Sequence, residues 1–111
     1  KNVYILLECL PNQSLMELSM KRRRLTEHET RFFMAQILTG IQYLHSQCII
    51  HRDLKLGNLL LDGDLNIKIC DFGLAAKLSY SSERKTTICG TPNYTAPEIL
   101  NQRKSGEGHS Y

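Results

Sequence analysis

Three polar side chains, Asp53, Asn58 and Asp71, stand at the borders of short apolar runs in the middle of the chain. A charged group at the edge of a buried hairpin is costly unless it is paired or binds an ion or a substrate. Two carboxylates and an amide oxygen form a hard-oxygen site that suits Mg²⁺, which takes few protein ligands and completes its shell with phosphates. These residues therefore predict a site for magnesium together with a nucleotide.

The elements around these residues are expected to form a β-hairpin. The runs "NLLLD" and "LNIKIC" are short, and in the second one Leu65, Ile67 and Ile69 alternate with other side chains. A Gly63-Asp64 turn joins the two runs, which is typical of a hairpin. The hairpin would bring its two outer ends, and the polar residues there, close together. The run "CII" ahead of the polar stretch is expected to form a further buried strand.

Two helices are expected before the hairpin. Residues from Ser14 to about Arg24 carry a weak stripe of leucine and methionine at helical spacing. Thr26 and Glu29 form a T-x-x-E capping box, which predicts a helix over residues 27–46. The residues that make its apolar stripe are Phe33, Ile37, Ile41 and Leu44, widened by Met34 and Leu38.

The two ends of the chain are expected to differ from this ordered middle. Residues 3–8 are β-branched, aromatic and short in extent, and they predict a strand that stops at Pro11. Residues 77–87, "KLSYSSERKTT", have too little apolar content to pack and predict a mobile loop. Pro97 is placed to begin a short helix, and the tail over residues 101–111 is polar.

Composition excludes several classes of protein. The 111 residues carry a formal charge of +3 with both signs interspersed, which is too mild for an electrostatic nucleic-acid binder. Four cysteines without a C-x-x-C pair indicate a reduced intracellular chain and argue against a structural zinc site. No run approaches the ~18 apolar residues of a membrane span, so a soluble protein without a membrane partner is expected. The basic cluster at 21–24 is either a nuclear-import or phosphate-binding patch or, more commonly, a solvated helix end.

The stretches "HRDLKLGN", "DFG" and "APE" resemble the catalytic-loop, metal-binding and activation-segment signatures of protein kinases. Their spacing also fits, because Asn58 stands five residues after Asp53, Asp71 thirteen after Asn58, and Glu98 closes the segment that Asp71 opens. Three such motifs in register, with a hairpin between the first two, argue strongly against chance. The stretches "LKLGNL", "ERKTTICGTPNY" and "GHS" further resemble the polo-like kinases.

The resemblance implies an α+β, protein kinase-like fold. Residues 1–111 would be a partial catalytic domain, running from the hinge strand through the first, mainly helical part of the C-terminal lobe to the activation segment. The Gly-rich loop, the strand lysine and the helix glutamate of a complete kinase are not among these residues. The long central helix beneath the catalytic loop is also missing, which would leave apolar surface uncovered. We therefore expect the 111 residues alone neither to bind ATP tightly nor to transfer phosphate.

The resemblance also implies a catalytic role for each matched residue. Asp53 resembles the base that accepts or orients the substrate hydroxyl proton, and Asn58 with Asp71 resembles the magnesium pair. Lys55 resembles the lysine that serine/threonine kinases direct at the transferred phosphate, and Thr91 in "GTP" matches its serine/threonine-type partner. The implied cofactors are ATP and Mg²⁺, and the implied substrates are Ser or Thr hydroxyls of proteins.

By the same resemblance, "LLECL" is the hinge that binds adenine. Leu7 would be the gatekeeper, while the Glu8 carbonyl and the Leu10 amide would bond the adenine edge. Leu60 would form the apolar floor of the nucleotide pocket. Cys70 either lines that pocket or is only a small buried hydrophobe, which is the commoner role of a free cysteine.

Thr87 is the expected regulatory residue. It lies four residues before Thr91, the spacing at which related kinases carry an activating phosphothreonine, and we prefer it to Thr86 for that reason. Phosphorylation adds nearly two negative charges, which an adjacent arginine can bind, and Arg52 is the expected receiver. An upstream activating kinase would then be a partner. The alternative is that both threonines are ordinary loop residues.

Two interpretations of the whole remain open. In the first, the chain is part of an active polo-like serine/threonine kinase with a cell-cycle role, located in the cytoplasm or nucleus and, by family resemblance, at centrosomes or the spindle. In the second, it is a truncated product that binds a partner or competes with the full enzyme without catalysis. A pure binder has no chemical need for Asp53, Lys55, Asn58 and Asp71 together, and this favours the first interpretation.

Overall fold

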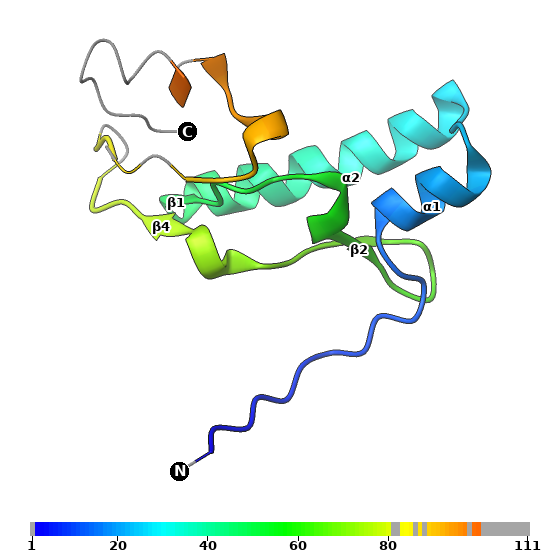
Figure 1. Cartoon of the computed structure of the whole chain (residues 1–111), viewed down its shortest axis with the longest axis horizontal. Helices are drawn as coiled ribbons and strands as arrows, with labels where there is room; N and C mark the ends of the chain where they lie inside the picture. The colour runs from blue at the N-terminus through cyan, green and yellow to red at the C-terminus, as the bar shows by residue number, and fades with distance from the viewer. Residues whose placement is uncertain (1, 81–82, 86, 88, 98, 101–111) are drawn as a thin grey trace.

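The computed structural model describes residues 2–80, 83–85, 87, 89–97 and 99–100. In chain order its elements are α1 (Leu15–Arg22), α2 (Glu27–Ser46), β1 (Ile49–Ile50), β2 (Leu59–Leu61), β3 (Ile67–Ile69) and β4 (Ala76–Lys77), with 3-10 turns at Leu56–Asn58, Phe72–Leu74 and Pro92–Tyr94. Helix α2 runs the length of the body, with α1 at one end and β1 and β4 at the other (Figure 1). Helices beside small antiparallel sheets confirm the expected α+β class.

Both helices begin at a capping box. At α2 the Glu29 N–H donates to Thr26 Oγ1 at 3.2 Å, and the Thr26 N–H donates to Glu29 Oε2 at 2.8 Å. These bonds satisfy backbone donors that the first helical turn leaves unpaired. The prediction of a helix over residues 27–46 is confirmed at both ends. Within the described residues no helix combines the length and the apolar character that crossing a bilayer requires.

The core lies between α2, α1 and the hairpin, and its buried residues are Leu15, Phe33, Ile37, Leu59 and Leu61. Burying each such side chain contributes about 1.5–3 kcal/mol to folding. The expectation that Met34 and Leu38 widen the apolar stripe is wrong, since they are 44% and 58% exposed. Each lies one residue, about 100° around the helix, beyond a buried neighbour and so faces away from the hairpin.

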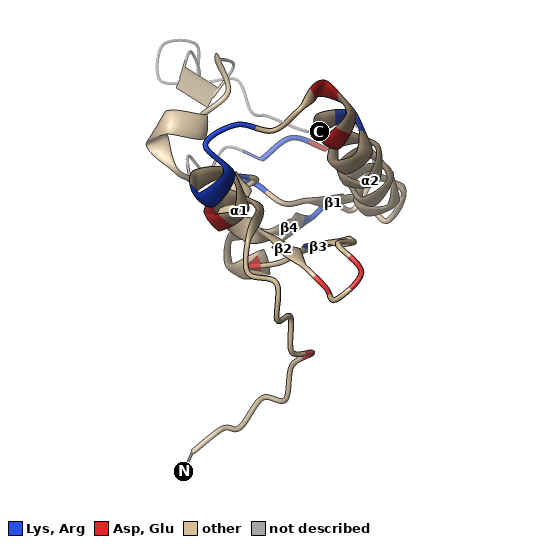
Figure 2. Cartoon of the chain, turned by 90° about the vertical axis from the view of Figure 1, so that its right-hand side faces the viewer, with Lys and Arg blue, Asp and Glu red and all other residues tan. Residues whose placement is uncertain are grey.

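The predicted hairpin is confirmed as an antiparallel β2–β3 pair, in which Leu59 lies opposite Ile69. Its second strand begins at Ile67 rather than at Leu65, because Leu65 has a φ of 64° and leaves the extended conformation. The carboxylate of Asp62 also accepts hydrogen bonds from the Asp64 and Asn66 N–H groups, both at 2.9 Å, and these bonds stabilise the turn. Acidic residues mark this turn in Figure 2.

The strand expected over residues 3–8 is wrong. The described residues 2–10 form no strand, and the side chains of residues 3–7 are 77–99% exposed. The segment runs away from the body (Figure 1). A strand exists only where a neighbour pairs its N–H and C=O groups, and β-rich composition cannot replace that neighbour.

The expectation that residues 77–87 do not pack is wrong at their start. Lys77 pairs with Ile49 in the β1–β4 sheet, and Leu78 is only 2% exposed. The Leu78 N–H donates to the Cys48 carbonyl at 2.7 Å, which continues the pairing by one residue. Further along, Pro97 lies at the start of a helical turn, as expected, in which the Leu100 N–H donates to the Ala96 carbonyl at 3.2 Å. Residues 81–82, 86, 88, 98 and the tail at 101–111 lie outside the described residues.

Candidate functional site

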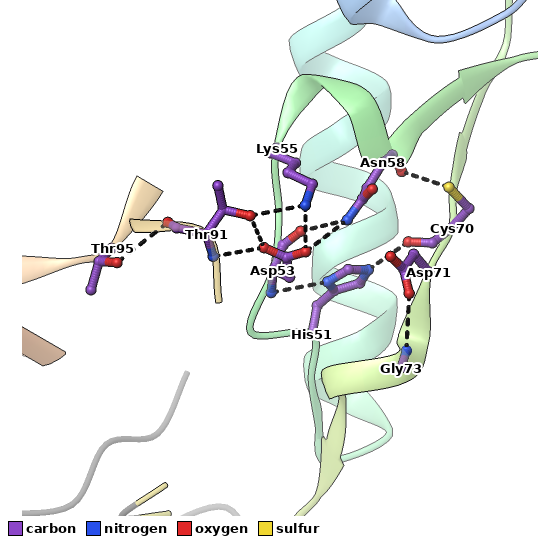
Figure 3. Close-up of polar contacts among 9 residues, drawn as sticks. All are labelled: His51, Asp53, Lys55, Asn58, Cys70, Asp71, Gly73, Thr91 and Thr95. Atoms are coloured by element: carbon purple, nitrogen blue, oxygen red, sulfur yellow. Dashed lines mark hydrogen bonds and ion pairs between the residues drawn. The ribbon is translucent and has the colours of Figure 1, made fainter. Parts of the chain in front are cut away.

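Asp53 lies at the centre of a polar cluster (Figure 3). Its Oδ2 accepts from Lys55 Nζ at 2.7 Å and from Asn58 Nδ2 at 3.2 Å. Its Oδ1 accepts from the Thr91 N–H at 2.9 Å and from Thr91 Oγ1 at 2.6 Å. The bond from Lys55, followed by that from Thr91, lowers the pKa of Asp53 to about 2, so this buried group is a carboxylate at neutral pH.

The cluster is assembled from two distant parts of the chain. The loop between β1 and the Leu56–Asn58 turn supplies Asp53 and Lys55, and Asn58 Nδ2 closes that loop by donating to the Asp53 carbonyl at 2.9 Å. Thr91 comes from a segment 38 residues further on. Lys55 Nζ joins both parts, since it also donates to Thr91 Oγ1 at 2.9 Å. A fixed carboxylate beside an ammonium group can accept a proton while the cation stabilises an anion.

His51 connects this loop to the strand that precedes Asp71. The Asp53 N–H donates to His51 Nδ1 at 3.3 Å, so the ring proton lies on Nε2, which donates to the Cys70 carbonyl at 2.9 Å. The buried ring also packs on Phe72, with ring centroids 4.9 Å apart. These contacts hold the loop that carries Asp53 against the turn that follows Asp71.

Gly90 is a residue that sequence reasoning missed. Its φ is +105°, and a Cβ at this position would lie 2.6 Å from the carbonyl oxygen of Arg52. Thr91 therefore reaches Asp53 only because glycine precedes it. A signal was available, namely a glycine directly before Thr91 in "CGTP", but its meaning depends on a close approach that the sequence does not state.

Arg52 and Thr87, the expected regulatory pair, have different surroundings in the structure. Arg52 adopts a φ of 66°, and its Nε donates to the Leu74 carbonyl at 2.7 Å, which ties the catalytic loop to the Phe72–Leu74 turn. Thr87 is exposed. No hydrogen bond joins these two described residues, so the expected regulatory pair is not assembled in this structure.

Asn58 and Asp71 stand at neighbouring ends of the hairpin. The Cys70 N–H donates to the Asn58 carbonyl at 2.9 Å, and Asp71 follows directly with a φ of 59°. The exposed carboxylate of Asp71 accepts one bond, of 3.3 Å, from the Gly73 N–H. Asn58 directs Nδ2 at Asp53, which leaves Oδ1 as its side-chain acceptor. One carboxylate and one amide oxygen fit a hard cation that takes few protein ligands.

The residues expected at the nucleotide line one open hollow of about 480 Å³, and they are Leu7, Glu8, Leu10, Leu60 and Cys70. Lys68 Nζ lies 3.4 Å from Glu8 Oε1 at its rim, an exposed ion pair of little energetic weight. Cys70 Sγ donates to the Asn58 carbonyl at 3.3 Å. Burial, and then the charge of Asp71, raises the pKa of this thiol, so Cys70 borders the hollow as a protonated and weakly nucleophilic group.

Comparison with known proteins gives a consistent result. The family model described as protein kinase domain matches residues 1–110. Similar relatives include "Cell cycle serine/threonine-protein kinase CDC5/MSD2" of Saccharomyces cerevisiae, 62% identical over 110 residues, and "Probable serine/threonine-protein kinase CCRP1" of Zea mays, 57% identical over 111 residues. "Serine/threonine-protein kinase polo" of Drosophila melanogaster is 53% identical over 111 residues. These matches cover 99%, 100% and 100% of this chain but only 15%, 17% and 19% of the three relatives.

Proposed function

The chain belongs to the protein kinase domain family, and from that premise we propose that the polypeptide carrying it transfers the γ-phosphate of ATP to Ser or Thr hydroxyls of proteins. The expected resemblance to this family, and within it to the polo-like serine/threonine kinases, is confirmed. The observation that carries the proposal is the Asp53 carboxylate, which accepts from Lys55 Nζ at 2.7 Å and from Thr91 Oγ1 at 2.6 Å.

Each group in this cluster has a use in phosphoryl transfer. The reaction needs positioning and charge stabilisation more than covalent help from the protein. The Asp53 carboxylate accepts or orients the proton of the attacking hydroxyl, while the Lys55 ammonium stabilises charge on the phosphoryl group in flight. Thr91 holds both, since its hydroxyl accepts from Lys55 and donates to Asp53.

Asn58 Oδ1 and the Asp71 carboxylate would hold Mg²⁺. When bound, the cation neutralises charge on the nucleotide phosphates. Mg²⁺ usually keeps several waters and binds through few protein groups, so phosphate and water oxygens would complete the shell. The adenine would occupy the 480 Å³ hollow, with the Glu8 carbonyl and the Leu10 amide on its edge.

Phosphorylation of Thr87 by an upstream kinase would regulate the enzyme. The exposure of Thr87 supports this, and so does the chemistry of Arg52, whose Nε donates to the Leu74 carbonyl and whose guanidinium has two further nitrogens that can bind a phosphate. Thr87→Val in the full-length polypeptide should lower the activity that an upstream kinase induces, with Thr86→Val as the matched control. Unchanged activation of Thr87→Val would rule this residue out.

The biological setting follows from the relatives. Residues 1–111 would form part of a catalytic domain, and the enzyme would be a polo-like kinase that acts in the cell cycle, as the name of the yeast relative indicates for that protein. Its place would be the cytoplasm or nucleus, including centrosomes or the spindle. The four matched catalytic and metal-binding side chains have no joint use in a non-catalytic binder, so the enzyme interpretation is preferred.

The direct test is phosphate transfer by the full-length polypeptide as the cell makes it. Purified protein receives Mg-ATP and three peptides that differ only in a Ser, Thr or Tyr acceptor. We expect label on Ser and Thr and none on Tyr. Lys55→Met should lower transfer about a hundredfold, as the loss of one transition-state donor does, whereas Lys77→Met, an exposed residue on β4, should keep it. Equal transfer to Tyr, or full activity in Lys55→Met, would contradict the proposal.

The size of the endogenous polypeptide decides between the two interpretations of the chain. An antibody raised against residues 77–87 would detect it in cell extracts. A species far larger than 12.7 kDa would mean that these residues belong to a whole kinase. A species of 12.7 kDa, which we expect to be inactive alone, would turn the search toward the protein that it binds.

A further inference from the structure

Helix α2 contacts the outer edge of β3 at two successive helical turns. The Ile67 N–H donates to Gln36 Oε1 at 2.8 Å. One turn later Gly40 makes room for Ile69, since a Cβ at Gly40 would lie 2.8 Å from Ile69 Cδ1. Four helical residues rise about 6 Å, and two strand residues advance about 6.6 Å. The spacing of the two contacts along α2 therefore matches their spacing along β3.

The hairpin pairing explains why Ile67 needs this partner. The Asn66 carbonyl accepts from Asp62 and the Cys70 N–H donates to Asn58, so the groups of alternate residues in β3 face β2. In an antiparallel ladder the residue between such positions directs its N–H away from the paired strand. The half-buried Ile67 N–H thus points to the open edge, where an unpaired donor is costly.

The other edge of the hairpin is held as well. There the Leu61 N–H donates to the Gln13 carbonyl at 2.8 Å, just ahead of α1. Backbone groups hold the β2 edge, whereas a side chain, Gln36, holds the β3 edge. Gln36 therefore adds one side-chain bond, on the open edge, to the ladder bonds that hold β3 to β2.

We propose that Gln36 is a positioning residue for the divalent cation, because it holds β3 in the register at which Cys70, next to Asp71, bonds Asn58. Ile67 lies four residues before Asp71, and the intervening chain is β3 itself with Cys70. Asn58 is held by its bonds to Asp53, and the Cys70 N–H bond of 2.9 Å to the Asn58 carbonyl joins the two ligand positions. A shift of β3 along α2 would loosen that bond and so change the separation of the two cation ligands. The inference rests on the proposed function, since it concerns the same metal pair.

The chain offers matched variants for the test. Gln36→Leu removes the acceptor and keeps the size, whereas Gln36→Glu keeps an oxygen that accepts the same bond. Gln42→Leu is the control, since Gln42 is an exposed residue of the same helix. Each variant is made in the full-length polypeptide, as is the parent. Two quantities are measured: amide hydrogen exchange at Ile67 without metal or nucleotide, and the Mg²⁺ concentration that half-saturates binding of a fluorescent ATP analogue.

Gln36→Leu should speed amide hydrogen exchange at Ile67 about fivefold, because one ordinary hydrogen bond is lost. It should raise the half-saturating Mg²⁺ concentration about tenfold, the lower end of the effect of outer-shell partners on metal sites. Gln36→Glu should restore both quantities toward the parent, and Gln42→Leu should change neither. Excess Mg²⁺ should recover nucleotide binding in Gln36→Leu, which a general loss of structure would not allow.

The outcomes separate this inference from the function on which it rests. A parent without Mg²⁺-dependent nucleotide binding overturns the proposed function, while exchange at Ile67 still tests the α2 contact. A parent that binds normally, with an unchanged Mg²⁺ requirement in Gln36→Leu, overturns the inference alone. If Gln36→Leu does not fold, Gln36→Asn takes its place: its amide is too short to reach Ile67, and an unchanged Mg²⁺ requirement there overturns the inference equally.

Discussion

Asp53 and Asp71 are the two carboxylates of the site, and their surroundings differ sharply. Asp53 is 8% exposed and accepts bonds from Lys55, Asn58 and Thr91. Asp71 is exposed and accepts one bond, of 3.3 Å, from Gly73. The proposed base, Asp53, must stay in one place through the reaction, and protein contacts hold it there. The proposed cation ligand, Asp71, must keep free lone pairs, and among the described residues only the Gly73 N–H donates to its carboxylate.

The catalytic loop and the D-F-G turn are nevertheless joined by several contacts. His51 donates to the Cys70 carbonyl and packs on Phe72, and Arg52 donates to the Leu74 carbonyl. Arg52 and Asp71 both adopt a left-handed backbone, which costs about 1–2 kcal/mol for a residue with a Cβ. The bonds between the two segments offset that cost and set the distance between the two carboxylates.

The largest expected effect is on Asp53. Asp53→Asn in the full-length polypeptide should lower phosphate transfer on the order of 10³-fold, because it removes the proposed base. Mg²⁺-dependent nucleotide binding should change far less, because Asn58 keeps its bond to the Asp53 carbonyl. Transfer of labelled phosphate to a Ser peptide measures the loss of activity. Asp64→Asn, in the exposed β2–β3 turn, is the control and should be fully active. An Asp53→Asn enzyme with a tenth of normal activity would end the distinction between the two carboxylates.

Asp71 should show the reverse pattern. Asp71→Asn should weaken Mg²⁺-dependent binding of an ATP analogue by at least about tenfold, since a direct ligand matters no less than the outer-shell partners that produce such losses. Titration of the analogue at several Mg²⁺ concentrations measures it, with Asp53→Asn in parallel. If both variants lost nucleotide binding equally, the two carboxylates would share one role.

The hydroxyl of Thr91 tests how much the hydrogen bonds around Asp53 contribute to turnover. Thr91→Val removes the hydroxyl bonds to Asp53 and Lys55 but keeps the Thr91 N–H bond of 2.9 Å. Loss of one hydrogen bond to a charged group predicts a fall in turnover of about tenfold or more. Thr91→Ser keeps the hydroxyl and should stay near the parent. Steady-state turnover of the three proteins decides, and equal values for the Val and Ser variants would remove the hydroxyl from the account.

The smallest effect concerns acid stability. The pKa of Asp53 falls from 3.8 to about 2 on folding, so its contribution to stability is present above 3.8 and is lost as the pH falls toward 2. The difference in free energy of unfolding between the parent and Asp53→Asn should therefore shrink over that window. Urea titrations at several pH values measure it. Glu17, Glu29, Asp62 and Glu83 also have lowered pKa values, but they are common to both proteins and cancel. A constant difference would contradict the assignment.

Local signals allowed the best predictions from sequence. Helix α2 was predicted at both ends because its capping box and its apolar period lie within the helix itself. The hairpin was predicted because its two strands are near neighbours in the chain. Two strands were predicted wrongly because strand formation depends on a distant pairing partner, which composition does not reveal. The strand expected at residues 3–8 has no such partner in the structure, whereas β4 pairs with β1 and was not predicted.

The sequence predicted the polar residues of the site but not the residues that hold them in position. Asp53, Lys55 and Thr91 were named from motifs, and the structure brings all three together. Gly90 and Gln36 were not named, because their importance lies in a close approach and in an edge amide that exist only in the folded chain. The types of the residues indicated the chemistry of the site. Only the tertiary contacts show that uncharged residues such as Gly90 and Gln36 hold the site residues in place.

The approach of Gly90 to Arg52 also shapes what substitutions the gene can accept. Every amino acid other than glycine carries a Cβ, so position 90 should be as intolerant in a saturation mutagenesis screen as Asp53, although Gly90 offers no side chain to the chemistry. A Cβ at Gly63 would meet nothing within 4 Å, and alanine there should survive selection. A mutational scan of this chain should therefore show that position 90 does not tolerate substitution, although its role is only to leave room for the Arg52 carbonyl.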